Sequence, residues 1–127
     1  MNKIEYAEGI ENFCKLVLEH QREAEKTRHV PDSHRLQRVL TESGRKYDKV
    51  IFRWDGQAHS EVRYFIERKT GDIYGAKSHL APNMNWYFGN LLTAQLWDWS
   101  DFHGRPVKDD SVRPVGRYGP YTRYMKI

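Results

Sequence analysis

The feature that most constrains the fold is the stretch from residue 44 to residue 91, where three runs rich in valine, isoleucine and aromatic residues alternate with turn residues. The first two runs are KYDKVIFRW and EVRYFIER, and a shorter third run begins at Ile73. Gly56 and Gly71 lie in the two joins, and glycine readily takes the positive φ that tight turns require. Such runs joined by short turns are typical of an antiparallel meander. We therefore predict a sheet core over residues 44–90.

Side chains alternate between the two faces of a strand, so each of the first two runs has one apolar and one mixed face. The apolar sets are Val50, Phe52 and Trp54 in the first run and Val62, Tyr64 and Ile66 in the second, opposite Lys49, Ile51 and Arg53 and opposite Arg63, Phe65 and Glu67. In the third run, Gly75 and Ala76 are small where a sheet favours bulk. We expect a close approach to the backbone there, for which a loop of the protein itself would be sufficient.

The apolar face needs a cover, and the amino-terminal segment 1–30 supplies it. Apolar residues recur there at helical spacing, which predicts an amphipathic helix over residues 3–27. Residues 34–42 fit either a short helix or a strand that forms a hairpin with the next run, and we favour the strand. The predicted fold class is α+β: an amino-terminal helix packed on an antiparallel sheet of three to five strands, followed by an irregular, aromatic carboxy-terminal third.

Length and charge narrow the class of protein. A chain of 127 residues with no linker-like tract is expected to form one domain. A net charge of +4 and a pI near 9.2 favour acidic partners. Cys14 is the one cysteine, so no internal disulfide can form, and on the apolar stripe of the helix we interpret it as a small buried hydrophobe. No run of about 18 apolar residues occurs, so we expect a cytoplasmic protein with no membrane partner.

Polar groups are densest just after the third run. We consider a phosphate pocket there, with a base stacked on one of two neighbouring aromatic rings. The candidate ligand-binding residues are Arg45, Lys46, Arg63, Lys77, Ser78 and His79, with Trp86 or Tyr87 for the base. The alternative is that Lys77 is solvated, Ser78 closes a turn and the aromatic residues pack in the core. The chain has neither a GxxxxGK[ST] phosphate loop nor an RNA-recognition strand motif.

The carboxy-terminal third offers candidates for a protein partner. Residues 91–103 are predicted to form a short helix in which Trp97 is partly exposed, and exposed tryptophans suggest a partner surface. The tail, residues 104–127, contains several prolines and glycines and is expected to be irregular. The candidate partner-binding residues are Trp97, Trp99, Tyr121, Arg123 and Tyr124. We interpret the acidic residues between 98 and 110 as turn caps or ion-pair partners, and we expect no metal site.

Several segments of the sheet region resemble a known family. They are GRKYDKVI, SEVRYFIERKTGDIYGAKSHLAP and the later pair Gly89 and Asn90. Over residues 44–90 the pattern is similar to a widespread family of small bacteriophage-encoded proteins with no established activity. The chain departs from it at Gly75, where lysine is frequent, and at His79, where tryptophan is frequent. The resemblance implies a phage origin and a compact fold, and small phage proteins are often inhibitors or sequestering proteins aimed at host machinery.

Three functional hypotheses remain open at this point. The leading one is a non-enzymatic phage protein that binds an anionic host component, a nucleic acid or a nucleotide, in the host cytoplasm. The second is a protein inhibitor or assembly subunit that binds a host protein. The third is a small hydrolase or transferase with His79 or His103 as base, although no motif indicates a catalytic residue or a cofactor. An open sheet edge also leaves room for a homodimer.

Overall fold

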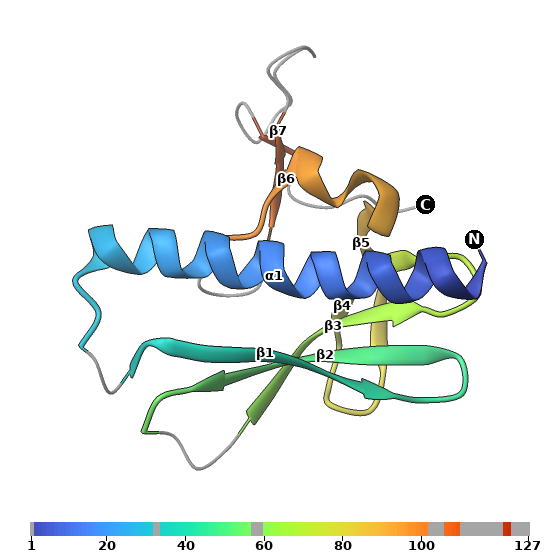
Figure 1. The fold of residues 1–127 in the computed structure, drawn as a ribbon, viewed down its shortest axis with the longest axis horizontal. Coiled ribbons are helices and arrows are strands. Elements are labelled where there is room, and N and C mark those ends of the chain that lie inside the picture. The colour runs from blue at the N-terminus through green and yellow to red at the C-terminus, as the bar shows by residue number, and fades with distance from the viewer. Residues whose placement is uncertain (1, 32–33, 57–59, 102–105, 110–120, 123–127) are drawn as a thin grey trace.

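The computed structural model describes residues 2–31, 34–56, 60–101, 106–109 and 121–122. Helix α1 (Lys3–Arg28) precedes a five-stranded antiparallel sheet in the order β1-β2-β3-β4-β5 (Figure 1). The strands are β1 (Leu36–Ser43), β2 (Tyr47–Trp54), β3 (Ser60–Glu67), β4 (Asp72–Ala76) and β5 (Pro82–Asn90). A 3₁₀ helix, η2 (Leu91–Leu96), leads to β6 (Trp97–Asp98), β7 (Val107–Asp109) and β8 (Tyr121–Thr122), which form a second antiparallel sheet. The predicted α+β class is confirmed.

Helix α1 is stabilised at its start by a capping box. The Asn2 side chain accepts a hydrogen bond from the Glu5 backbone N–H (2.8 Å), and the Glu5 carboxylate accepts one from the Asn2 N–H (3.3 Å). The helix ends at Arg28, and the C-cap residue His29 adopts the left-handed conformation (φ 54°). Pro31 follows two residues later and disfavours helical geometry in Val30. The predicted helix is therefore present, with one residue more at its end.

The ambiguous residues 34–42 contain the strand that we favoured, because β1 pairs along its length with β2. The hairpin that follows has a different face pattern from the one predicted. Val50 lies opposite Tyr64 and Ile51 opposite Val62, so Arg63 is an extra residue, a β-bulge in β3. The prediction that Val62 shares the core face with Tyr64 was therefore wrong. The Arg63 guanidinium lies 5.0 Å from the centre of the Phe52 ring, on the side that α1 covers.

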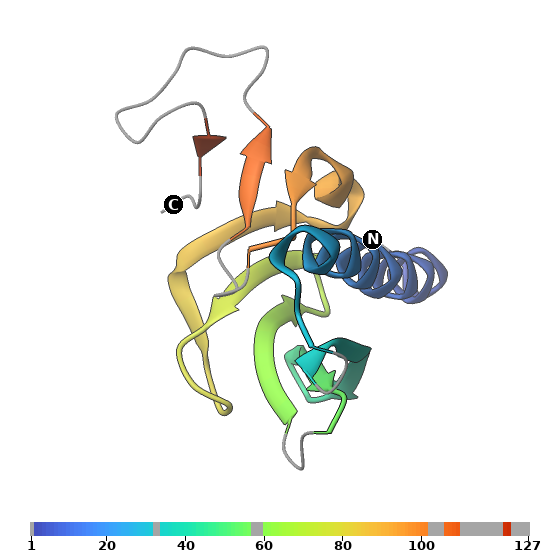
Figure 2. The same ribbon diagram turned by 90° about the vertical axis from the view of Figure 1, so that its left-hand side faces the viewer.

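The core lies between α1 and the sheet, which curves around one side of the helix (Figure 2). Tyr64 is at its centre and makes edge-to-face contacts with four aromatic rings. These rings are Phe13, Phe52, Phe88 and Trp99, with centroids 5.3–6.1 Å from that of Tyr64. The close approach predicted at Gly75 is present, because a β-carbon there would lie 3.1 Å from Trp86 Cβ and 3.3 Å from Phe88 Cε2.

The segment after β5 differs from the short helix predicted for residues 91–103. Helical geometry stops at Leu96, and Trp97 is extended (φ −113°, ψ 149°). Trp97 and Trp99 are both core residues, with exposed fractions of 3% and 0%. Residues two apart point the same way in an extended chain but not in a helix, so the extended backbone lets both indoles enter the core. Part of the tail that was expected to be irregular forms the strands β7 and β8.

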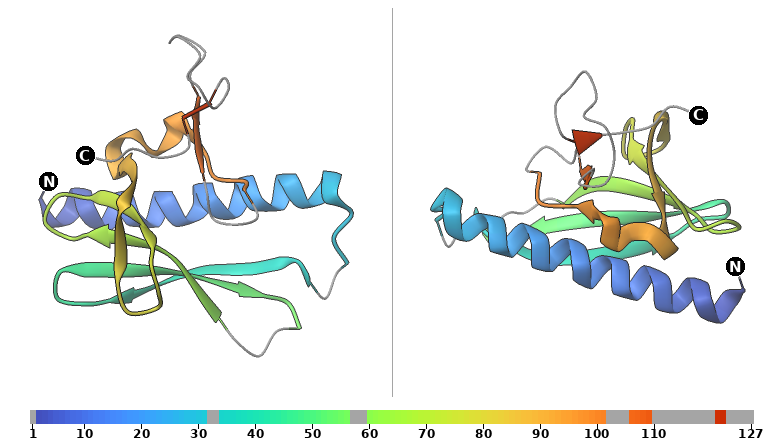
Figure 3. Two further views of the ribbon diagram at one scale, coloured as in Figure 1. Left: turned by 180° about the vertical axis from the view of Figure 1, so that it is seen from behind. Right: turned by 90° about the horizontal axis from the view of Figure 1, so that it is seen from above.

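Helix η2 lies beside the amino-terminal half of α1 (Figure 3). Within the residues that the structure describes, no helix combines the length and the apolar character needed to cross a membrane.

Candidate anion-binding groove

Two turns of the main sheet meet at the start of α1. The β1–β2 turn (residues 44–46) and the β3–β4 turn (residues 68–71) lie at the same end of the sheet, and the Arg68 N–H donates to the Lys46 carbonyl oxygen (2.9 Å). Between these turns, β1 and α1 is a groove of about 630 Å³. Its lining residues are Asn2, Lys3, Tyr6, Ala7, Ile10, Thr41, Ser43, Arg45, Asp48, Arg68 and Lys69. We call it the turn groove.

The turn groove has a strong excess of positive charge. Its lining includes four cations, Lys3, Arg45, Arg68 and Lys69, against one carboxylate, Asp48. Arg45 and Lys69 are exposed and make no hydrogen bond or ion pair with any residue that the structure describes. Their charges are therefore available to a ligand. The cations come from α1, β1–β2 and β3–β4, so the tertiary fold brings them together.

Asp48, the carboxylate of the groove lining, is buried. It is 4% exposed, and its Oδ2 accepts a hydrogen bond of 2.6 Å from the Tyr6 hydroxyl. Its Oδ1 lies 3.6 Å from Arg68 Nε, while Arg68 Nη1 donates to the Gly44 carbonyl oxygen (2.8 Å). Burial, with the adjacent Asp48 carboxylate, raises the pKa of Tyr6 far above its ordinary value. Tyr6 thus stays a hydrogen-bond donor, and Arg68, whose side chain is 47% exposed, is held in the lining of the groove by two contacts.

Of the residues predicted to bind phosphate, the structure brings two to this end of the sheet. Arg45 lines the turn groove, and Lys46 is next to it, with its ammonium 5.4 Å from the centre of the Tyr47 ring. Arg63 does not join them, because the bulge places it over Phe52 and Trp54, and its Nε forms an ion pair with Glu61 (3.1 Å). It is buried and acts in the packing of the sheet.

The other predicted residues lie elsewhere. Lys77, Ser78 and His79 are exposed in the β4–β5 turn, which is at the opposite end of β4 from the β3–β4 turn. Ser78 closes that turn by accepting a hydrogen bond from the Leu80 N–H (3.1 Å). The two candidate stacking rings are also separated from each other. Trp86 packs against the core beside Phe88, whereas Tyr87 contacts Tyr74 on the other face of the sheet.

The Tyr87 hydroxyl donates to Asp72 Oδ1 (3.2 Å), and burial with this carboxylate raises the pKa of Tyr87 to about 12. The single pocket formed by all eight predicted residues is therefore not assembled. Sequence reasoning missed Lys3, Arg68 and Lys69. The meander itself held the signal for Arg68 and Lys69, because alternate turns of an antiparallel sheet lie at the same end.

The predicted partner-binding residues have a different outcome. Trp97 and Trp99 are buried, so they cannot present an exposed tryptophan surface. Tyr121 lies in β8, and Arg123 and Tyr124 lie outside the described residues.

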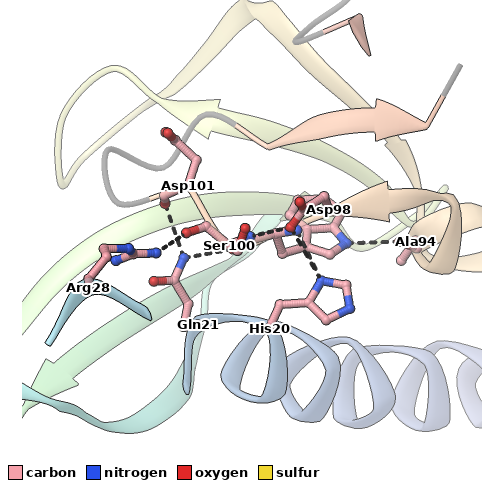
Figure 4. Close-up of polar contacts among 8 residues, drawn as sticks. His20, Gln21, Arg28, Ala94, Asp98, Ser100 and Asp101 are labelled. Atoms are coloured by element: carbon pink, nitrogen blue, oxygen red, sulfur yellow. Dashed lines mark hydrogen bonds and ion pairs between the residues drawn. The ribbon is translucent and has the colours of Figure 1, made fainter. Parts of the chain in front are cut away.

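A second polar cluster holds the backbone of residues 98–101 against α1 (Figure 4). Gln21 Nε2 donates to the carbonyl oxygens of Trp99 (2.6 Å) and Asp101 (3.1 Å), and Arg28 donates to that of Ser100. His20 Nδ1 accepts a hydrogen bond from the Trp99 N–H (3.1 Å). These side chains satisfy backbone groups around the buried Trp99, in a segment that has little sheet pairing of its own. The cluster positions the segment and leaves the turn groove as the better candidate site.

No group of three or more histidine, cysteine, aspartate or glutamate residues within the described ranges is placed to hold a metal ion.

Comparison with curated proteins found no match, and neither did comparison with solved structures. A family match covers residues 2–105, from the cap of α1 past β6, and so includes the helix, the main sheet and every residue of the turn groove. The chain therefore belongs to DUF7717, a family of unknown function.

Proposed function

We propose that the protein is a non-enzymatic binding protein whose turn groove takes an anionic ligand, a nucleic acid or a nucleotide. The observation that carries this proposal is the convergence of Lys3, Arg45, Arg68 and Lys69 on one groove with a single carboxylate. Charge-assisted hydrogen bonds from arginine and lysine are the usual means of holding phosphate. The net charge of +4 acts in the same direction at longer range.

The biological setting that we propose follows the resemblance to phage-encoded proteins. A small protein that captures a nucleotide or nucleic acid in the cytoplasm of an infected bacterium would act as an inhibitor or a sequestering protein. Sequestration requires no catalytic group, only a site with sufficient affinity.

The test is titration of the full chain with DNA and RNA oligonucleotides and with linear and cyclic nucleotides, at about 50 mM and about 200 mM salt. The double variant Arg45→Ser, Lys69→Ser should weaken binding at least about tenfold, because it removes two charge-assisted contacts. The matched control is Lys77→Ser, which removes a cation from the distant β4–β5 turn and should change affinity less than about twofold. Absence of binding at low salt, or equal loss in the control, would contradict the proposal.

A second candidate function, binding of a host protein, is favoured by two exposed leucines. Leu92 and Leu96 on η2 are 64% and 48% exposed. They replace the buried Trp97 and Trp99 as the apolar groups that a partner could cover. A partner that survives nuclease treatment in a pull-down and is lost with Leu92→Asp would support this function.

A further inference from the structure

We infer that the ligand of the turn groove is a small phosphorylated ring compound, of the nucleotide class, and that a nucleic-acid strand is not its ligand. This inference rests on the proposed function, because it takes the turn groove as the binding site. Two independent features of the molecule carry it: the limits of the positive surface and the mixed lining of the groove.

Exposed acidic side chains bound the positive surface along α1. Along α1, Glu5 and Glu8 line the neighbouring groove between α1 and η2. A strand that leaves the turn groove along α1 would meet these carboxylates. Proteins that bind single strands instead provide a continuous cationic track for successive phosphates.

The lining changes character across the groove. Arg45, Arg68 and Lys69 come from the two turns and form the cationic end. On the α1 side, Asn2 and Lys3 are followed by Tyr6, Ala7 and Ile10, so the lining becomes largely apolar after the first turn of the helix. Thr41 and Ser43 on β1 add hydroxyl groups that can donate or accept hydrogen bonds. A phosphate at the turns would therefore place a flat, partly apolar body against the helix, with hydroxyls within reach of a sugar or a base edge.

The size of the groove agrees with this class of ligand. A volume of about 630 Å³ is large enough for a small organic ligand. Inorganic phosphate or pyrophosphate would fill the cationic end and leave the apolar end unused. A nucleotide uses both ends.

The experiment measures affinity against ligand length and against ligand chemistry. The probes are AMP, ATP, pyrophosphate and 5′-phosphorylated thymidine oligonucleotides from one residue to a dodecamer, at the two salt concentrations given above. We expect affinity to level off by the dinucleotide, with no further gain for the dodecamer. We also expect ATP to bind at least about tenfold more tightly than pyrophosphate, because only ATP contacts the apolar end.

The variant Ala7→Leu separates the two ends of the groove. Ala7 is exposed on α1, and both residues are good helix formers, so the fold should be retained. Leucine there should fill the apolar end, weaken ATP at least about fivefold and leave pyrophosphate within about twofold.

Three results would overturn the inference, and the experiment distinguishes them. A steady gain in affinity and in salt dependence up to the dodecamer would identify a strand as the ligand and leave the proposed function standing. Equal affinities for ATP and pyrophosphate, unaffected by Ala7→Leu, would limit the site to a phosphate group. If no probe binds, the inference and the proposed function both fail.

Discussion

Gly75 lies in β4 with the side chains of Trp86 and Phe88 against its backbone. The β5 strand reaches this position through an irregular register, in which Tyr74 pairs with Tyr87 but Gly75 pairs with Asn83. The residues between them bring Trp86 to the core face. The absence of a side chain at Gly75 is therefore a packing requirement of the β4–β5 pair.

At the same scale, Gly75→Ala should destabilise the protein by about 1–3 kcal/mol, since overpacking a close contact forces its neighbours to move. The free energy of unfolding in urea measures the effect. Lys77→Ala is the control, because it truncates an exposed side chain in the adjacent turn and should change stability by less than about 0.5 kcal/mol. Equal stability of Gly75→Ala and the unaltered protein would show that Trp86 and Phe88 do not pack as described.

At the scale of elements, α1 does more than cover the sheet. Its carboxy-terminal half holds the backbone of residues 98–101 through His20, Gln21 and Arg28 (Figure 4). Its amino-terminal turns line the turn groove, where Tyr6 bonds to Asp48. The carboxy-terminal end of α1 therefore positions the segment after η2, and its amino-terminal end lines the candidate site.

The Gln21 contacts give a prediction for this element. Gln21→Met keeps the length of the side chain but removes the donor to the carbonyl oxygens of Trp99 and Asp101. One buried and one partly buried acceptor lose their partner, so stability should fall by about 1–3 kcal/mol. Hydrogen exchange should rise first at residues 97–101 and little in β2 and β3.

The exposed change Glu19→Gln on the same helix is the control for Gln21→Met, and it should alter neither stability nor exchange. Uniform acceleration of exchange through the whole sheet would contradict a local role for Gln21.

At the scale of the whole molecule, burial of weak acids predicts how stability depends on alkaline pH. Burial raises the pKa of the Cys14 thiol to about 12 from an ordinary value of 9.0. Burial also raises the pKa values of Tyr6, Tyr64, Tyr74 and Tyr87 above 10.0. The unfolded chain therefore releases these protons at lower pH than the folded chain does. Stability is full below pH 9 and decreases as the pH rises above it.

Denaturation in urea from pH 8 to pH 11 tests this dependence. Between pH 9 and pH 10 Cys14 should contribute no more than about 1.4 kcal/mol per pH unit, and the four tyrosines add to the decrease as the pH approaches 10. Above pH 10 the tyrosines should steepen it. The variant Cys14→Ala should show a smaller decrease between pH 9 and pH 10 and keep the steeper part. An unchanged slope in this variant would contradict the assignment to Cys14.

Much of the fold could be predicted from local patterns. The helical spacing of apolar residues predicted α1. Gly56 and Gly71 predicted two turns, and both glycines adopt positive φ there. The small residue at Gly75 indicated a close approach that the structure contains. The helix and the turns depend on neighbours in the chain, and at Gly75 the missing side chain is itself the signal, so the sequence records these features directly.

The candidate site was predicted less well. Arg45 lines the turn groove, but Arg63 is turned toward the core by a bulge, and Lys77 and His79 lie at the other end of β4. A bulge shifts the face of every later residue in its strand, and the alternating pattern does not show where one occurs. The expected exposure of Trp97 was wrong for a related reason, since an extended backbone replaced a helix.

The sequence by itself determined the helix, the meander and the turns between its strands, because hydrophobic periodicity and glycine conformation act over a few residues. Only the tertiary structure decided which cations share a groove. Lys3 and Lys69 are far apart in the chain, and they meet because α1 packs across a sheet whose alternate turns lie at one end. That arrangement depends on the direction of the helix over the sheet, which is set by packing of the aromatic core around Tyr64.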